Sequence, residues 1–261
     1  MNLAQLTQQV ISLSTSVATY IEEQARKQVT VDLKTLNNLV TVVDKTAEQM
    51  FVAGLSKLLP EAGFIAEEGT SVKKGETYNW VIDPLDGTTN FVHGIPAYCT
   101  SVALIKNNQP IIGVVYAVQQ QECFSAFTGG GASLNGIPIQ CSSNGLLANA
   151  LLATGFPYDD FTREQAYLKA FQYFFRYTRG LRRLGSAALD LAYVACGRVD
   201  GFFEYGLNPW DVAAGALIVK EAGGIVTDFN EGNNYIFGEE IIASSIPIQP
   251  PFFKVLTESF N

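Results

Sequence analysis

Apolar residues recur every three or four positions through the first 21 residues of the chain. They are Leu3, Leu6, Val10, Leu13, Val17 and Ile21. This spacing puts them on one face of a helix, so the pattern predicts an amphipathic helix packed against a core. The polar stretch 34–38 predicts a loop. The apolar run 39–44 fits either the end of a short strand or the start of a helix, and residues 46–59 predict a helix body.

The middle of the chain changes to strand-like patterning. Apolar and β-branched runs occupy residues 99–105, 111–118 and 122–127. Short polar turns separate them, at Asn107-Asn108 and at residues 119–121. Runs of this length with short links predict an antiparallel meander.

The second half alternates between the two patterns. Strands are predicted over residues 151–154, 200–205, 225–228 and 241–244, and helices over residues 163–177, 186–196 and 208–222. Asn208 and Pro209 suit the N-cap and first position of the last helix. No long linker separates the halves. We therefore predict an N-terminal α+β half, residues 1–145, and a C-terminal α/β half, residues 146–261, within one compact unit.

Composition favours a folded domain with a large core. Of 261 residues, 48% are hydrophobic and 16% are charged, which argues against disorder. The formal net charge of −8 disfavours nucleic acid and anionic membranes as partners, and a phosphate-bearing substrate would need local neutralisation by cations. The N-terminal segment lacks a signal-peptide pattern, and no apolar run reaches membrane-spanning length. We expect a cytoplasmic protein.

Histidine and cysteine usage excludes several chemistries. The single histidine, His93, makes a histidine-rich zinc site or a Ser-His-Asp hydrolase improbable. The four cysteines, Cys99, Cys123, Cys141 and Cys196, are scattered and are expected to be reduced, buried thiols. Catalysis would then depend on carboxylates, hydroxyls, backbone amides and bound metal.

The strongest chemical signal follows one apolar run. Residues 80–82 lead directly to Asp83, with Asp86, Gly87 and Thr88 close behind. Placing several unpaired carboxylates beside a buried strand end is costly unless a cation binds them. This segment therefore predicts a divalent metal site.

Other acidic residues fall at the ends of predicted elements. Glu67 and Glu68 follow an apolar run, and Asp211 lies in the first turn of a helix. Each alone also fits a solvated loop or ordinary helix capping. Together they predict oxygen ligands for a hard cation, with Mg²⁺ favoured over Ca²⁺ or Mn²⁺. Two such ions about 4 Å apart could hold the entering and leaving oxygens of a phosphoryl transfer. The Asp-x-Asp motif of haloacid-dehalogenase phosphatases is disfavoured, because the spacing from Asp83 to Asp86 is one residue longer.

Several motifs together resemble the inositol monophosphatase family. They are Glu67-Glu68, the run from Trp80 to Asn90 continuing to Pro96, the run from Asn208 to Gly215, Glu221-Ala222-Gly223-Gly224, the segment ending at Asp44, and Gly185-Ser186-Ala187. The resemblance covers nearly the whole chain. It implies an α+β fold, a layered α/β/α/β/α sandwich of the sugar-phosphatase type. It also implies a homodimer and Mg²⁺-dependent, lithium-sensitive hydrolysis of a small phosphate monoester, with myo-inositol 1-phosphate as the leading substrate.

The resemblance implies a role for each matching residue. The metal ligands, for two or three Mg²⁺ per subunit, would be Glu67, Asp83, the Leu85 carbonyl, Asp86, Thr88 and Asp211. The catalytic residues would be Asp44, Thr88 and Glu67. Asp44 with Thr88 would orient and deprotonate a water that attacks phosphorus directly. The substrate contacts would be Gly87, Thr88, Gly185, Ser186, Ala187, Glu204 and Asp211.

Some positions depart from the family pattern. Asn38 replaces an Asp that many members have, and Asn208 replaces a His of some members. Neither would be a direct metal ligand, so we expect tuning rather than loss of activity. Lys34 aligns ambiguously with a basic residue that some members place near the site.

Alternative functions remain open. Histidinol phosphate, fructose 1,6-bisphosphate and 3′-phosphoadenosine 5′-phosphate are alternative substrates for the same mechanism. The nucleotide could use the basic run of Arg176, Arg179, Arg182 and Arg183. A hypothesis of another class is an interaction protein of the RNA-processing machinery, which the acidic charge and the absence of a basic tail disfavour.

Overall fold

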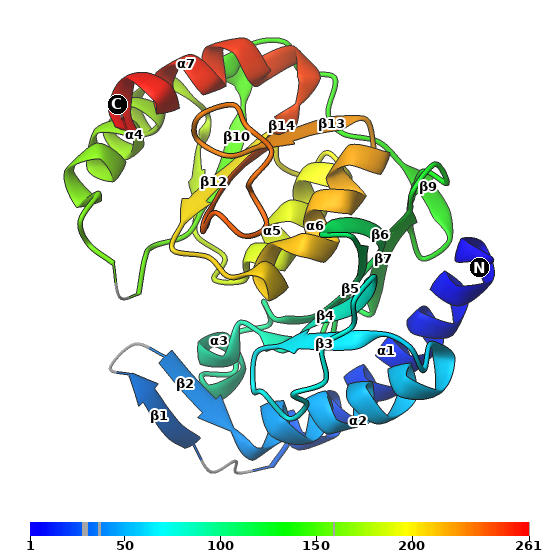
Figure 1. Ribbon diagram of the computed structural model, residues 1–261. Helices are drawn as coiled ribbons and strands as arrows, with labels where there is room; N and C mark the ends of the chain where they lie inside the picture. Colours follow the sequence, from blue (N-terminus) through cyan, green and yellow to red (C-terminus); the bar gives the residue numbers. More distant parts are fainter. Residues whose placement is uncertain (28–30, 36–37, 159, 261) are drawn as a thin grey trace.

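Five layers of helix and sheet make up the molecule (Figure 1). The computed structural model describes residues 1–27, 31–35, 38–158 and 160–260, without the side chains of residues 31–40. Along the stack, a helix pair, a large sheet, a second helix pair, a smaller sheet and a third helix pair follow one another. The predicted α/β/α/β/α sandwich is therefore confirmed.

The larger sheet has seven strands in the order β3-β4-β5-β6-β7-β8-β9. Their bounds are β3 Gly63–Ala66, β4 Tyr78–Asp86, β5 Cys99–Lys106, β6 Gln109–Ala117, β7 Glu122–Phe127, β8 Ala132–Leu134 and β9 Ile137–Ile139. β3 pairs parallel to β4, and every later pair is antiparallel. The predicted meander is confirmed as β5, β6 and β7.

Helices α1 (Leu3–Ala25) and α2 (Val42–Leu58) cover the outer face of this sheet. Four residues of the apolar stripe predicted for the first helix are buried, with Val10, Val17 and Ile21 fully inaccessible, and Leu3 and Leu13 are partly buried. α2 begins at Val42, four residues before the predicted helix body. The reason is a capping box, in which Thr41 and Asp44 satisfy each other's backbone N–H groups.

The middle helix layer consists of α5 (Ala187–Ala195) and α6 (Pro209–Glu221) between the two sheets. Eight of the nine residues of α5 are buried, as are the eight consecutive residues 212–219 of α6. A helix that packs against protein on all sides needs no polar face. Asn208 and Pro209 occupy the predicted cap and first helical positions of α6.

The smaller sheet has the strand order β11-β10-β12-β14-β13. Its strands are β10 Leu151–Thr154, β11 Gly180–Arg182, β12 Gly201–Tyr205, β13 Gly224–Thr227 and β14 Glu240–Ser245. Helices α4 (Glu164–Tyr177) and α7 (Gln249–Phe260) form the last layer. Phe174, Phe203 and Phe252 are fully buried between these helices and the sheet.

Two sequence expectations differ from the structure. The predicted loop at residues 34–38 overlaps two paired antiparallel strands, β1 (Val31–Thr35) and β2 (Asn38–Thr41). Two of the four cysteines, Cys141 and Cys196, are partly rather than fully buried. The predicted roles of the Lys34 and Asn38 side chains lie outside what the structure describes. Among the described residues, no helix has the length and apolar character needed to cross a bilayer.

Candidate active site

Strand β4 carries the first two carboxylates of the site. The sequence predicts that the strand stops before Asp83, but it continues to Asp86 with an irregular register between the two residues. Pro84 cannot donate a ladder hydrogen bond, and the Leu85 N–H turns back to donate to Asp83 Oδ1 at 2.9 Å. The irregularity brings Asp83 and Asp86 to the same pocket.

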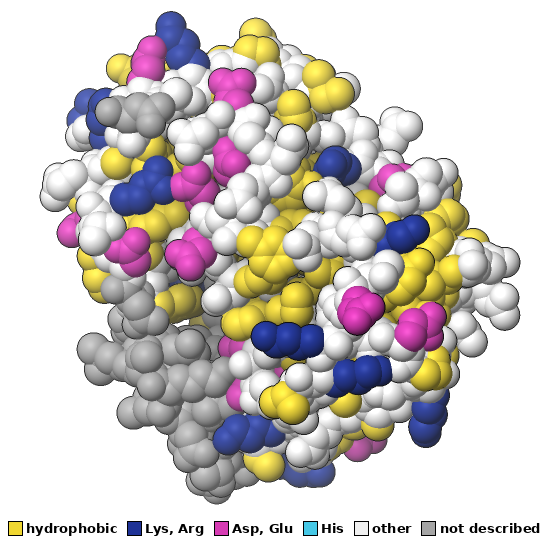
Figure 2. Space-filling view, viewed as in Figure 1, with side chains coloured by type: hydrophobic (Ala, Val, Ile, Leu, Met, Phe, Trp, Pro, Cys, Tyr) yellow, Lys and Arg dark blue, Asp and Glu magenta, His cyan; other side chains and the backbone are white. Residues whose placement is uncertain are grey.

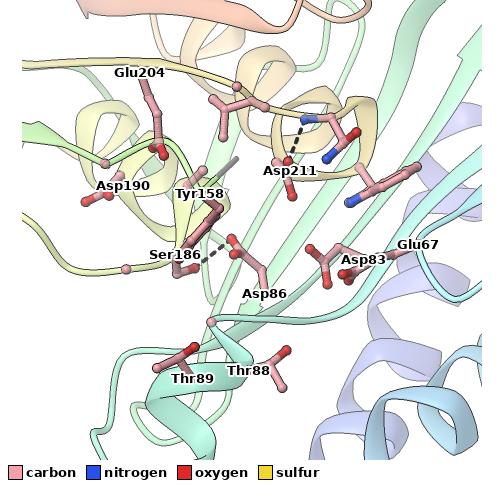
Figure 3. Close-up of a pocket in the computed structure, with 18 of the residues that line it drawn as sticks. Glu67, Asp83, Asp86, Thr88, Thr89, Tyr158, Ser186, Asp190, Glu204 and Asp211 are labelled. Carbon is pink, nitrogen blue, oxygen red and sulfur yellow. Dashed lines mark hydrogen bonds between the residues drawn. The ribbon is translucent and has the colours of Figure 1, made fainter. Parts of the chain in front are cut away.

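The start of α6 supplies the third carboxylate. Asp211 is held by a capping box, in which the Asn208 N–H donates to its Oδ2 at 2.6 Å. One oxygen from each of Asp83, Asp86 and Asp211 lies within 4.8 Å of the others, and Figure 3 shows the three side chains facing one another. Three carboxylate oxygens at this spacing fit the ligand set of a hard divalent cation.

Charge repulsion within this cluster is severe. Burial raises the pKa of Asp83 well above its usual range, and the nearby carboxylates of Glu67, Asp86 and Asp211 raise it further. Burial likewise raises the pKa of Asp211, and the negative charge of Asp86 raises it further. Carboxylates in this position are stabilised as anions only by a cation, so the cluster fits a bound metal.

Helix α5 holds Asp86 from its other side. Ser186 Oγ donates to Asp86 Oδ2 at 2.7 Å, and the Ala188 N–H donates to the same oxygen at 2.8 Å. Ser186 is also the N-cap of α5. Because one oxygen of Asp86 is occupied in this way, Oδ1 is left for a ligand in the pocket.

Thr88 connects Asp44 to the pocket. Asp44 is fully buried and does not line the pocket, whereas Thr88 does. Thr88 Oγ1 lies 2.9 Å from Asp44 Oδ1 and 3.0 Å from the Leu85 carbonyl. Its single proton can be given to only one of them. Asp44 Oδ2 accepts from the N–H and hydroxyl of Thr41, so its remaining oxygen is aimed at Thr88.

Gly87 permits this arrangement. Its φ of +94° lies in the left-handed region, and a Cβ there would lie 2.9 Å from the Ala97 carbonyl oxygen. Any side chain would therefore be strained and would also clash. The turn at Gly87 starts the short helix α3 (Thr88–Val92) and brings Thr88 beside the acidic cluster.

A fully buried glutamate fixes the loop that carries Glu67. Glu48, on α2, accepts hydrogen bonds from the Glu68 and Thr70 N–H groups, each at 2.7 Å. Glu67 lies at the start of this loop and lines the pocket. Glu48 has no sequence signal of its own, because it falls within an ordinary helical pattern.

We expect Glu48→Gln to weaken metal binding by roughly 10-fold or more, since an amide cannot accept both hydrogen bonds and the Glu67 loop would loosen. Titration of activity against Mg²⁺ measures the effect. Activity at saturating Mg²⁺ should return near the wild-type value. Glu61→Gln, at an exposed position, is the control. An unchanged Mg²⁺ requirement in Glu48→Gln would contradict the role of Glu48.

The pocket brings together residues from both halves of the chain. Of the predicted site residues, it is lined by Glu67, Asp83, Leu85, Asp86, Gly87, Thr88, Gly185, Ser186, Ala187, Glu204 and Asp211. Only Asp44 reaches it indirectly, through Thr88. The sequence reasoning missed Thr89, Gly155, Tyr158 and Asp190, which also line the pocket. For Asp190 a signal existed, because a lone Asp interrupts the otherwise apolar helix 187–195.

Stability of the metal-free protein should depend on pH through Asp86. Burial raises the pKa of Asp86 from 3.8 to about 6, against the lowering effect of its bonds from Ser186 and Ala188. Between these values the folded state binds more protons than the unfolded state, so stability falls as pH rises from about 4 to 6. The loss attributable to this group is on the order of 3 kcal/mol.

Melting curves in EDTA, compared between wild type and Asp86→Asn, measure this dependence. The difference in stability between the two proteins should shift in favour of the variant as pH rises. A pH-independent difference would contradict the prediction.

This fold, with buried carboxylates beside a hydroxyl in one pocket, defines the sugar-phosphatase class. The profile of the inositol monophosphatase family matches residues 2–259, and the chain belongs to that family. The Nus factor SuhB of Pseudomonas aeruginosa is 44% identical over 222 residues, which cover 83% of this chain and 82% of that protein.

Two solved structures are also similar. The extragenic suppressor protein suhB of Bartonella henselae has a TM-score of 0.92 at 35% identity and covers 96% of this chain and 98% of its own. The IMPase of Thermotoga maritima has a TM-score of 0.87 at 40% identity and covers 96% of each chain. The family assignment indicates metal-dependent phosphatase activity and leaves the substrate open.

Proposed function

We propose that the chain hydrolyses a small phosphate monoester with Mg²⁺ as its metal, two or three ions per subunit, and that myo-inositol 1-phosphate is its leading substrate. The observation that carries the proposal is the convergence of Asp83, Asp86 and Asp211 within 4.8 Å, beside the Thr88 hydroxyl that Asp44 holds. The leading substrate rests on the family assignment.

The site residues have distinct proposed roles. Glu67, Asp83, the Leu85 carbonyl, Asp86, Thr88 and Asp211 would hold the metal ions. When bound, such ions neutralise the phosphate, polarise it and make a water more acidic. Gly87 and Thr88 would position the phosphate, and Gly185, Ser186, Ala187 and Glu204 would contact the leaving alcohol. All of these residues line one pocket.

Proton transfer is proposed to use Thr88 and Asp44. The Thr88 hydroxyl would accept a proton from the attacking water as it passes its own proton to Asp44 Oδ1, 2.9 Å away. The water oxygen forms the new bond to phosphorus, and the bond from phosphorus to the ester oxygen breaks as that oxygen takes a proton from solvent water. Asp44 then returns its proton to solvent. The products are an alcohol and inorganic phosphate, with no phosphorylated protein.

Release of phosphate tests the proposal. Purified protein would be assayed with Mg²⁺ against inositol 1-phosphate, histidinol phosphate, fructose 1,6-bisphosphate and 3′-phosphoadenosine 5′-phosphate, and the kcat/KM values compared. EDTA should abolish release, and Li⁺ should inhibit it. Activity that is indifferent to EDTA would refute the metal-dependent mechanism, whereas a different preferred ester would correct only the substrate.

We also propose that residues 1–145 and 146–261 act as one catalytic unit in a cytoplasmic homodimer. Support for the single unit comes from the pocket, to which both halves contribute. Asn90 ties the halves together, since its Nδ2 donates to the carbonyls of Ala97 and Leu184, each at 2.7 Å. Sedimentation of the purified protein tests the dimer.

A second candidate function is a role in the transcription machinery. The observation that favours it is the name Nus factor of the Pseudomonas relative. Direct RNA binding has little support, because basic and acidic side chains are interspersed over the face shown in Figure 2 and the net charge is −8. Affinity capture from its own cells tests this function, and recovery of the protein alone would count against it.

A further inference from the structure

Asp190 is a buried carboxylate to which the proposed mechanism gives no task. It lies in the first turn of α5 and is 1% exposed. Within the described part of the chain, its Oδ1 has no hydrogen-bond partner. A buried carboxylate that is left unpaired destabilises the folded protein. Its presence is therefore easier to explain by a ligand than by folding.

The pocket provides the place for that ligand. Asp190 lines the same pocket as the acidic cluster, and Figure 3 shows it beside Glu204, across the pocket from Asp83. Glu204, on β12, is 7% exposed. A Cβ at Gly155 would lie 2.0 Å from the Glu204 carboxyl carbon, so only glycine there leaves room for this carboxyl group. The end of the pocket away from Asp83 thus presents two carboxyl groups.

Arg183, whose positive charge acts on Asp190, has contacts of its own. Arg183 lines the pocket, but its Nη2 donates to the Tyr158 hydroxyl at 3.0 Å and its guanidinium packs over the Phe156 ring. Burial raises the pKa of Asp190, and the charge of Glu204 raises it further, while Arg183 only partly offsets these effects. Arg183 thus offsets part of the negative charge near Asp190 and Glu204, and it leaves the Asp190 carboxyl group available to a ligand.

We propose that Asp190 is a specificity-determining residue that binds hydroxyl groups of the substrate's leaving alcohol together with Glu204. This inference rests on the proposed phosphatase function. Hydroxyl groups can donate hydrogen bonds to both carboxyl groups. A second phosphate at this end would meet two carboxyl groups, which offer it no cation and repel it when they are ionised. Asp190 therefore selects polyol monophosphates over bisphosphates and over esters whose alcohol has no further hydroxyl.

Two substrates and two variants test the assignment. Inositol 1-phosphate has hydroxyls on its leaving alcohol, and p-nitrophenyl phosphate has none. We expect Asp190→Asn, which preserves shape, to lower kcat/KM for inositol 1-phosphate roughly 10- to 100-fold, mostly through KM. The value for p-nitrophenyl phosphate should change less than about threefold. Asp190→Ser should behave in the same way.

The control is Asp200→Asn, which removes a carboxylate that is 8% exposed and accepts from the Leu151 N–H outside the pocket. It should leave the ratio of the two kcat/KM values unchanged. Equal losses on both substrates, no loss on either, or misfolding of both Asp190 variants would overturn the assignment. Failure of the wild type on both substrates would instead refute the phosphatase function and the assignment with it.

Discussion

Asp83→Asn is expected to lower turnover by about 100-fold or more while raising the stability of the metal-free protein. Asp83 is 2% exposed, and one of its oxygens lies within 4.8 Å of oxygens of Asp86 and Asp211. Removing its charge would take away a principal ligand of the proposed metals, on the scale of losing a main electrostatic stabiliser. In the absence of metal, the same change relieves the repulsion that raises the pKa of Asp83.

Melting curves with and without Mg²⁺, beside single-turnover rates, measure both effects. Wild type should gain stability on adding Mg²⁺, whereas Asp83→Asn should gain little. Asp200→Asn is a matched control, because its buried carboxylate accepts from a backbone N–H at 2.8 Å. It should lose stability and keep its response to Mg²⁺. An Asp83→Asn protein that is less stable than wild type in EDTA would contradict the account.

Much of the fold could be predicted from local patterns. α1 and α4 each have a polar face, and β5 to β7 are short runs joined by turns, so their periodicity was informative. A helix could not be predicted at α7, because the pair Pro250 and Pro251 is typical of a loop. Proline is nevertheless tolerated in the first turn of a helix, where these two residues lie. The apolar run 39–44 left a short strand open, and β2 lies at its start. Its partner β1 could not be predicted, because a five-residue strand that contains Asp32 and Lys34 lacks an apolar run.

The site could be predicted only where residues are close in sequence or match a family motif. Asp83 and Asp86 lie three positions apart and end an apolar run, so their chemistry was visible. The hydrogen bond from Ser186 to Asp86 joins residues 100 positions apart. Only the family resemblance predicts that these two residues belong to one site. Glu48 falls within an ordinary helical pattern and has no local signal. Asp190 is visible locally only as a lone Asp in an apolar helix. The loop or pocket that each residue serves is set by long-range packing, which local patterns do not contain.

Asp44→Asn is expected to lower kcat by roughly 100-fold or more with little change in KM, since general-base assistance contributes at this scale. Asp44 is fully buried and accepts the Thr88 hydroxyl at 2.9 Å. An asparagine could present its N–H₂ group to Thr88 and would no longer take up a proton there. Thr88→Ser keeps the hydroxyl and should retain most activity, whereas Thr88→Val should resemble Asp44→Asn.

Asp44 also caps α2, so loss of helix stability must be separated from loss of proton transfer. Asn2→Ala provides the comparison, because Asn2 caps α1 by accepting from the Gln5 N–H at 3.1 Å, outside the pocket. Loss of such a cap costs about 1 kcal/mol. Both variants should melt at lower temperature, but only Asp44→Asn should lose kcat. If Asp44→Asn kept its kcat, Asp44 would be a helix cap alone, and the proton would have to leave by another route.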